Sequence, residues 1–308
     1  MRPLSRGVRE TPPVRTTMVR AATADDLPAC HAVWLATEHP VPAGPRDTAA
    51  VLPLHEHELN TGRLVVATLG RQVVGFGATL TRSRVAYLAD LFVRPEVQGR
   101  GIGRRLLHAL LDDQDGPRFT MASTDPRAQR LYASFGMIPR EDFYYLRADP
   151  ATVDLSRLDS SELELVPAGI DDVIEYDRIV TCRDRRIDFE HARDHLGARL
   201  FLARRAGDVV GYASFVHPIW WNPWHRDAVR IGPIGLLDPG AAAAVLAATV
   251  RAAAVVDSSW LGPFVPESSP ALRPLLAAGF RVEDTDVLMS SEPDLLDPAR
   301  YHPAVDTA

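Results

Sequence analysis

The chain has 308 residues, of which 46% are apolar and 24% are charged, and its formal net charge is −6. This length suits about two domains of ordinary size, and the composition is that of a globular protein. Because no apolar run approaches the ~20 residues that a membrane-spanning helix needs, we expect no membrane partner.

Charge is divided unevenly between the two halves. Residues 1–150 contain 19 arginines against 16 acidic residues, whereas residues 151–308 contain 15 arginines against 24 acidic residues. Nucleic-acid-binding proteins present a basic surface. The acidic second half therefore argues against a nucleic-acid partner.

The first 16 residues are rich in Arg and Pro and contain no apolar core of a signal peptide. We expect residues 1–16 to be a flexible tail. Cys30 and Cys182 lie far apart in helix-like contexts. We expect both to be small, reduced core residues of a cytoplasmic protein.

Strand and helix patterns alternate through the first half. A short strand near residue 19 leads into an acidic helix start, and residues 64–78 form a strand, a tight turn and a second strand. Residues 85–93 are an apolar, β-favouring run, and an amphipathic helix follows. These patterns predict a mixed α/β sheet.

The segment between that strand and that helix is rich in glycine. It consists of Gln98, Gly99, Arg100, Gly101, Ile102 and Gly103, followed by Arg104. Bare backbone N–H groups at a helix N-terminus, with added arginines, form a site for a pyrophosphate. A dinucleotide fingerprint would need a third glycine where Arg104 stands. A glycine-rich turn without a ligand is the remaining alternative.

The spacing Q-x-x-G-x-G in this segment resembles the GNAT superfamily of N-acetyltransferases. Residues 128–137, AQRLYASFGM, resemble the A-x-x-L-Y-x-x-x-G-F segment of the same family. The resemblance implies that residues 98–104 bind the pyrophosphate of acetyl-CoA as co-substrate. It also implies that pantetheine pairs with backbone groups of Leu91, Phe92 and Val93, where the Leu91 N–H faces the thioester oxygen.

The resemblance assigns chemical roles to three further residues. Tyr132 would protonate the departing thiolate, although a packing tyrosine is the alternative. Asp125 stands where many relatives have an asparagine that contacts pantetheine, but Asp followed by Pro126 favours a helix cap. Asp90 is the candidate base for the amine, and a strand-edge Asp bound to a neighbour is an equal alternative.

In this family the acceptor contacts come from the first two helices and the loop between them. The polar and aromatic candidates there are Trp34, Glu38, His39, His55 and Glu58. His55 and His57 suggest a metal site, but residues two apart do not share a helix face. We therefore expect a solvated helix face here and no metal.

The second half repeats the first. Residues 165–173 parallel 19–27, residues 200–214 parallel 64–78, and residues 271–280 parallel 128–137. The fold expected is α/β, with two tandem GNAT-like domains at 17–150 and 162–308. Each would have a mixed, mostly antiparallel sheet flanked by helices.

The repeat has lost the residues that would bind acyl-CoA. Gln98, Gly99 and Gly103 fall on Ala242, Ala243 and Ala247, and Tyr132 falls on Leu275. We therefore expect one live site and one degenerate copy.

The function expected is transfer of an acetyl group from acetyl-CoA directly to a small-molecule amine. The alternatives are a non-catalytic acyl-CoA-binding sensor or scaffold, and a GNAT-fold enzyme of other acyl-CoA chemistry. The acceptor and the oligomeric state stay open.

Overall fold

Both halves of the chain alternate strands and helices. The computed structural model describes residues 17–38, 53–159, 162–219 and 226–304. The elements of the first half are β1 (Thr17–Ala21), α1 (Leu27–Glu38), α2 (Pro53–Thr61), β2 (Arg63–Leu69), β3 (Gln72–Arg82), β4 (Val85–Val93), α3 (Ile102–Leu111), β5 (Arg118–Ser123), α4 (Pro126–Ala133) and β6 (Ile138–Arg147).

The second half repeats this order and adds a short strand at its end. Its elements are β7 (Glu164–Pro167), α5 (Ile170–Thr181), α6 (Arg186–Leu196), β8 (Arg199–Arg205), β9 (Asp208–Val216), β10 (Val229–Leu236), α7 (Ala242–Ala254), β11 (Leu261–Pro266), α8 (Leu272–Ala277), β12 (Arg281–Ser290) and β13 (Tyr301–His302). The predicted hairpins are β2–β3 and β8–β9, and β4 has the predicted bounds.

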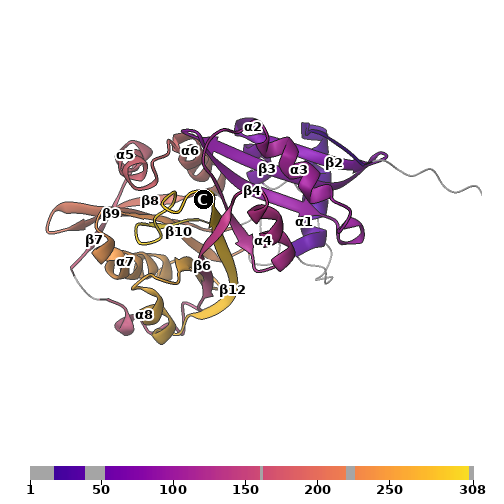
Figure 1. Ribbon diagram of the computed structural model, residues 1–308. Coiled ribbons are helices and arrows are strands. Elements are labelled where there is room, and N and C mark those ends of the chain that lie inside the picture. Colours follow the sequence, from indigo (N-terminus) through magenta and orange to yellow (C-terminus); the bar gives the residue numbers. More distant parts are fainter. Residues whose placement is uncertain (1–16, 39–52, 160–161, 220–225, 305–308) are drawn as a thin grey trace, which may run out of the picture.

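One continuous sheet runs through both halves (Figure 1). Its strand order is β1-β2-β3-β4-β5-β12-β6-β11-β10-β9-β8-β7, with β13 beside β10. Among the described strands only β4–β5 and β10–β11 pair in parallel. The prediction of an α/β fold with a mixed, mostly antiparallel sheet is confirmed.

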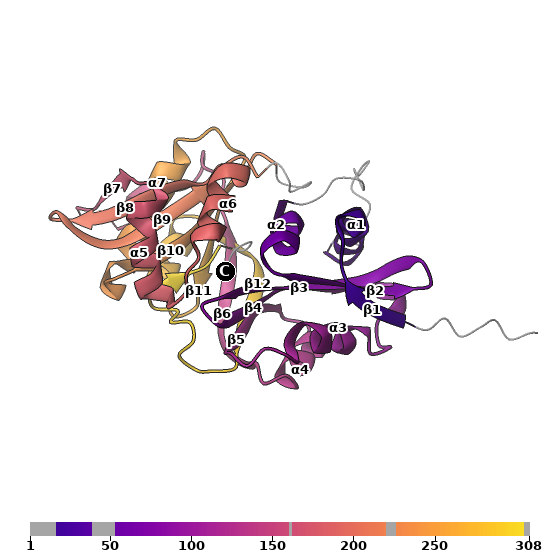
Figure 2. The same cartoon turned by 90° about the horizontal axis from the view of Figure 1, so that it is seen from above.

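Helices cover both faces of the sheet in the first half (Figure 2). On one face, α1 and α2 pack over apolar residues of β2 and β3 such as Val66 and Phe76. On the other face, α3 buries Leu106, Leu107 and Leu110 against the same strands. Their i, i+1, i+4 spacing forms the apolar stripe that the sequence predicts for this helix.

The two halves exchange their last strands. β12 from the second half lies between β5 and β6, antiparallel to both, with Val287 opposite Ala122 on one side. β6 from the first half pairs on its other edge with β11, where Tyr144 lies opposite Val265. Each half therefore completes the sheet of the other, so hydrogen bonding crosses the division that the sequence suggests near residues 150–162.

The cysteine prediction is half wrong. Cys30 is buried, but Cys182 is exposed, and both thiols are free. Cys182 is the C-cap that follows α5 and has a left-handed conformation with φ of 55°. Among the helices of the described segments, none has the length and apolarity that a bilayer crossing requires.

Candidate active site

The glycine-rich segment forms an open turn at the N-terminus of α3. Gly99 and Gly101 both have φ of +75°, in the left-handed region that glycine adopts at little cost. A Cβ atom at either position would meet nothing within 4 Å, so the backbone conformation and not space requires glycine. Gln98 Nε2 donates to the Val93 carbonyl at 2.9 Å and ties the turn to the end of β4.

No side chain caps the first turn of α3, because the residue before it is Gly101. The N–H groups there stay available to an anion, and the helix dipole favours negative charge at this point. Ile102 is buried and holds the helix start on the core, and the Cα of Gly103 lies close to Leu131. This geometry fits the predicted pyrophosphate site.

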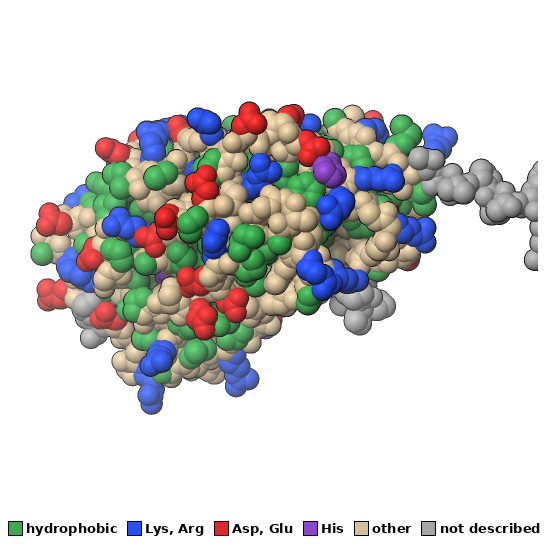
Figure 3. All heavy atoms as spheres, viewed as in Figure 1, with side chains coloured by type: hydrophobic (Ala, Val, Ile, Leu, Met, Phe, Trp, Pro, Cys, Tyr) green, Lys and Arg blue, Asp and Glu red, His purple; other side chains and the backbone are tan. Residues whose placement is uncertain are grey.

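Arginines surround this turn. Arg100 and Arg104 are exposed, and within the described segments neither forms an ion pair with a carboxylate. The Arg104 guanidinium lies over the Phe135 ring at 5.9 Å from its centroid. Basic side chains predominate at the end of the molecule that carries α3, whereas acidic ones are frequent over the second half (Figure 3).

The sheet opens beside this turn. β4 and β5 pair only at Ala86–Arg118 and Tyr87–Phe119, and then diverge. Thr120 Oγ1 donates to the Leu88 carbonyl at 2.9 Å, at the start of the gap. Past this point the backbone of residues 90–93 has no partner on β5. Such an open edge accepts an extended ligand in the way that it accepts a strand.

A bulge in β4 determines which side chains face which helices. Ala78 pairs with Asp90 and Thr79 with Leu88, so Ala89 is the additional residue. Beyond the bulge, Leu91 and Val93 pack against the α3 cluster. Asp90 consequently faces α2, on the side of the sheet where the acceptor is expected.

Asp90 meets α2 in a buried polar cluster. Its Oδ2 lies 3.1 Å from His55 Nε2, and Glu58 is on the same face of α2. One ligand atom from each of the three residues lies within 4.8 Å of the others. Phe92, the next residue on the Asp90 face, packs against Phe76 with ring centroids 5.5 Å apart.

The other predicted acceptor residues are less closely associated with this cluster. Trp34 on α1 is partly buried, and its ring stacks on His31 with centroids 5.8 Å apart. Glu38 is the last residue of α1. His39 lies outside the described residues. The structure thus brings together Asp90, His55 and Glu58 from the predicted set.

Tyr132 lies on the opposite side of the sheet from Asp90. It is 8% exposed and packs with Ile102 and Leu106 in the α3 cluster. Burial, together with the negative charges of Asp286, Asp90 and Asp125, raises the pKa of Tyr132 well above its usual value. The phenol therefore stays protonated over the whole physiological pH range.

Asp125 is the N-cap of α4. It accepts from the Arg127 N–H at 2.8 Å and pairs with the Arg127 guanidinium at 2.8 Å. These hydrogen bonds from Arg127 lower the pKa of Asp125 below its usual range. The capping role favoured by the sequence is confirmed.

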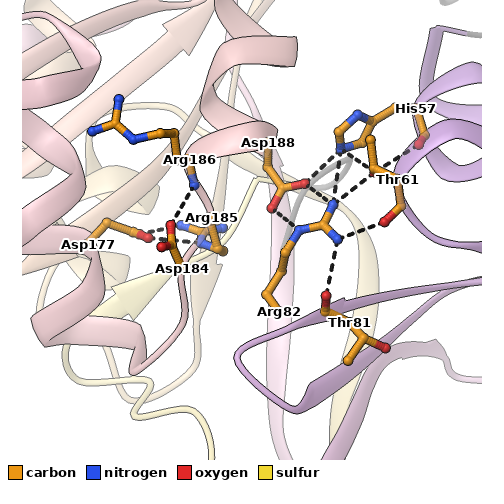
Figure 4. A network of polar contacts seen from close by, with 9 residues as sticks. All are labelled: His57, Thr61, Thr81, Arg82, Asp177, Asp184, Arg185, Arg186 and Asp188. Atoms are coloured by element: carbon orange, nitrogen blue, oxygen red, sulfur yellow. Dashed lines mark hydrogen bonds and ion pairs between the residues drawn. The ribbon is translucent and has the colours of Figure 1, made fainter.

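A second polar network joins the two halves next to α2 (Figure 4). Asp188 of α6 accepts from His57 Nε2 at 2.7 Å and from the Arg82 guanidinium at 2.9 and 2.6 Å. Arg82 also donates to Thr61. His57 therefore points away from His55, as expected for residues two apart on a helix. The sequence gives no indication of Asp188, because 131 residues separate it from His57.

At the positions that align with the glycine-rich turn, the described part of the second half has a helix instead. Ala242, Ala243 and Ala247, which align with Gln98, Gly99 and Gly103, lie in α7, and Ala242 and Ala247 are buried. Leu275, the counterpart of Tyr132, is 1% exposed in the core. The prediction that this segment is a plain helix start is confirmed.

In the second half, β13 occupies a position beside β10. β13 pairs with β10 in antiparallel register, Tyr301 opposite Gly235 and His302 opposite Ile234. The Leu236 N–H donates to the Arg300 carbonyl at 2.8 Å. The edge that is open in the first half is therefore already paired in the second.

We expect His302 to make the protein less stable in acid. Burial lowers the pKa of His302 to about 4, while in the unfolded chain the value is ~6.5. The unfolded state therefore binds an additional proton between these values, so the free energy of unfolding falls as pH drops from about 6.5 to 4, by up to about 3 kcal/mol. Urea unfolding at several pH values measures this loss.

The variant His302→Leu is the control, because groups elsewhere titrate equally in both proteins. Its free energy of unfolding should depend less on pH over this range than that of the unchanged protein. Equal pH dependence in the two proteins would show that His302 does not contribute.

Comparisons with known proteins agree with this geometry. A family model described as an acetyltransferase (GNAT) domain matches residues 60–137, which include β4, the glycine-rich turn and α4. A sequence search of curated proteins found no match.

Three solved structures with low sequence identity share the fold. A candidate acetyltransferase from Pyrococcus horikoshii has a TM-score of 0.68 at 19% identity, covering 99% of this chain and 100% of its own. A GCN5-related N-acetyltransferase from Sphaerobacter thermophilus has 0.58 at 16%, covering 97% and 100%. A tandem GNAT protein from the clavulanic acid biosynthesis pathway has 0.59 at 16%, covering 90% and 98%.

Proposed function

We propose that this tandem GNAT-fold chain, whose residues 60–137 match a GNAT acetyltransferase domain, is an N-acyltransferase. Its first half would move the acetyl group of acetyl-CoA directly to the amine of a small molecule. The observation that carries the proposal is the open edge of β4 next to the uncapped helix N-terminus. An extended chain ending in a pyrophosphate fits these two features together.

Acetyl-CoA would lie in the first half, from the glycine-rich turn along the open edge of β4. The pyrophosphate would bind the N–H groups of residues 99–103 with Arg100 and Arg104, and pantetheine would pair with the backbone of Leu91, Phe92 and Val93. This direction places the thioester near the β4 bulge. Asp125 would contribute by capping α4 rather than by contacting the ligand, because its oxygens are engaged by Arg127.

The transfer needs a proton acceptor, an oxyanion donor and a proton donor. Asp90 would take the proton from the acceptor ammonium, so that the amine nitrogen can attack the thioester carbon. The Leu91 N–H would donate to the thioester oxygen as negative charge develops there. When the C–S bond breaks, Tyr132 would give its proton to the thiolate. The reaction proposed here uses no metal.

The acceptor would approach from the α1–α2 side. His55 and Glu58 lie there beside Asp90, and Trp34, Glu38 and His39 would line the approach. Carboxylates on this side suit an amine that arrives as a cation. The second half (162–308) would be a degenerate copy, and residues 1–16 would be a dispensable tail of a cytoplasmic protein.

Calorimetric titration with acetyl-CoA tests the proposal. We expect one site per chain, because the second half lacks the turn and its gap is filled by β13. Gly101→Val should weaken binding at least about 10-fold, since a β-branched residue does not adopt its positive φ and the helix start must shift.

Gly70→Val is the matched control. Gly70 also has positive φ, +67°, and open space around it, but it lies in the β2–β3 turn. It should cost similar backbone strain and leave acetyl-CoA binding intact. Two sites per chain would show that the second half also binds acetyl-CoA. No binding at all would remove the acyltransferase proposal.

A further inference from the structure

We propose that His55, Glu58 and Asp90 form a binding site for a divalent transition-metal ion of the Zn²⁺ type. The three residues come from two elements, α2 and β4, and face one another across the acceptor side of the sheet. From the sequence we expect no metal, because His55 and His57 do not share a helix face. That expectation does not concern Glu58 or Asp90.

The geometry of the two elements brings the ligand atoms together. His55 and Glu58 are three residues apart on α2 and therefore share a face. The bulge at Ala89 turns Asp90 toward that face. The exposed fractions are 1% for His55, 0% for Glu58 and 7% for Asp90, so the cluster is shielded from solvent. The solvated helix face expected from the sequence is therefore wrong for His55 and Glu58.

The two carboxylates of the cluster suit a divalent cation. They lie close together in a buried place, where like charges repel and desolvation disfavours ionisation. A doubly charged ion would bind both carboxylates together with a neutral imidazole, which is the form that binds metals.

The distance between His55 and Asp90 also fits metal ligands. His55 Nε2 and Asp90 Oδ2 are 3.1 Å apart, yet Asp90 Oδ2 has no hydrogen-bond partner among the described residues. Zinc bonds of ~2.0–2.2 Å separate neighbouring ligand atoms by about 3.0–3.4 Å. The two atoms are thus spaced as ligands of a common ion and not oriented as donor and acceptor. The Phe76 ring meets the His55 imidazole edge-on at 5.0 Å and fixes its orientation.

The ligand set identifies the kind of ion. Imidazole with carboxylates suits zinc and its transition-metal neighbours, whereas Mg²⁺ and Ca²⁺ prefer oxygen ligands alone. Three protein ligands leave a fourth position, which water or an amine can occupy.

Occupation of this site would block the transfer reaction, and this step rests on the proposed function. An ion bound to Asp90 engages the oxygen that would accept the amine's proton. Leu91 and Val93 face the α3 side, so acetyl-CoA binding would be unaffected. The ion would therefore inhibit turnover without competing with acetyl-CoA.

The test is titration of metal-free full-length protein with ZnCl₂ in the absence of acetyl-CoA. We expect one site per chain, and a Co²⁺-loaded sample should show the visible absorption of a low-coordinate site. Glu58→Gln and Asp90→Asn keep the side-chain size and should each weaken Zn²⁺ binding by about 100-fold. Circular dichroism verifies that each variant is folded, and either folded variant suffices.

His108→Gln is the matched control. His108 lies 2.9 Å from Asp112, but this pair is exposed on α3. Zn²⁺ binding should survive this change. The site is overturned if Zn²⁺ does not bind, if both cluster variants bind as the unchanged protein does, or if His108→Gln abolishes binding. An acetyl-CoA titration of the same metal-free samples tests the proposed function separately.

Discussion

Replacing Asp188 with alanine should lower the free energy of unfolding by about 3–5 kcal/mol, because it removes one partner of a buried ion network. The Asp188 side chain is 6% exposed and receives hydrogen bonds from both His57 and Arg82. Burial alone would raise the pKa of Asp188, but these bonds outweigh it and hold the value at about 2. Without Asp188 the Arg82 guanidinium, 9% exposed, is left with its charge uncompensated.

Chemical denaturation of the variant measures this loss. Asp194→Ala is the matched control, since Asp194 lies on the same helix but pairs with its exposed neighbour Arg193. That change should alter stability little. If both variants unfold at the same denaturant concentration, the network between the halves does not stabilise the fold as argued.

A change at Asp188 should also affect binding of the acceptor amine. His57 is on α2, between His55 and Glu58, so loss of its partner loosens the helix that carries these residues. A milder change, Asp188→Asn, should raise the KM for the amine more than the Kd for acetyl-CoA. Equal change in both would mean that the network supports the whole half rather than the acceptor side.

Tyr132→Phe should lower kcat by about 100-fold or more, the usual effect of removing a proton donor from a transfer step. The raised pKa of Tyr132 keeps the hydroxyl protonated, as the proposed donation of its proton to the thiolate requires. The change removes one oxygen and keeps the ring that packs in the α3 cluster, so we expect little loss of stability. Steady-state kinetics with acetyl-CoA titrations separates the loss of turnover from any loss of binding.

Tyr145→Phe provides the opposite control. Its buried hydroxyl donates to Asp286 at 2.7 Å, away from the glycine-rich turn, so we expect reduced stability of about 1 kcal/mol and unchanged kcat. Full turnover in Tyr132→Phe would leave Tyr132 as a packing residue. Acetyl-CoA binding without turnover on any amine would favour the sensor or scaffold.

Local patterns predicted much of the fold. The apolar run at 85–93 is β4, the glycine-rich turn opens α3, and Asp125 followed by Pro126 caps α4. Each depends on residues that are neighbours in sequence, where strand alternation, glycine conformation and capping act. The internal repeat also identified correctly which half had lost the turn.

Features that depend on distant contacts could not be predicted. The exchange of β6 and β12, the pairing of β13 with β10, and the Asp188 network join segments far apart in the chain. The bulge at Ala89 leaves no clear sequence signal, yet it aims Asp90 at His55. Cys182 is exposed and stands in a left-handed conformation at a helix end, a position that a cysteine does not suggest.

The exchange of β6 and β12 makes each half of the chain depend on the other for a complete sheet. A second copy that only stood beside the first could be deleted once its own ligand site was lost. Here β12 fills a place between β5 and β6 that nothing in the first copy supplies. The second half is therefore needed whether or not it binds a ligand, because without β12 the sheet of the first half would lack a strand.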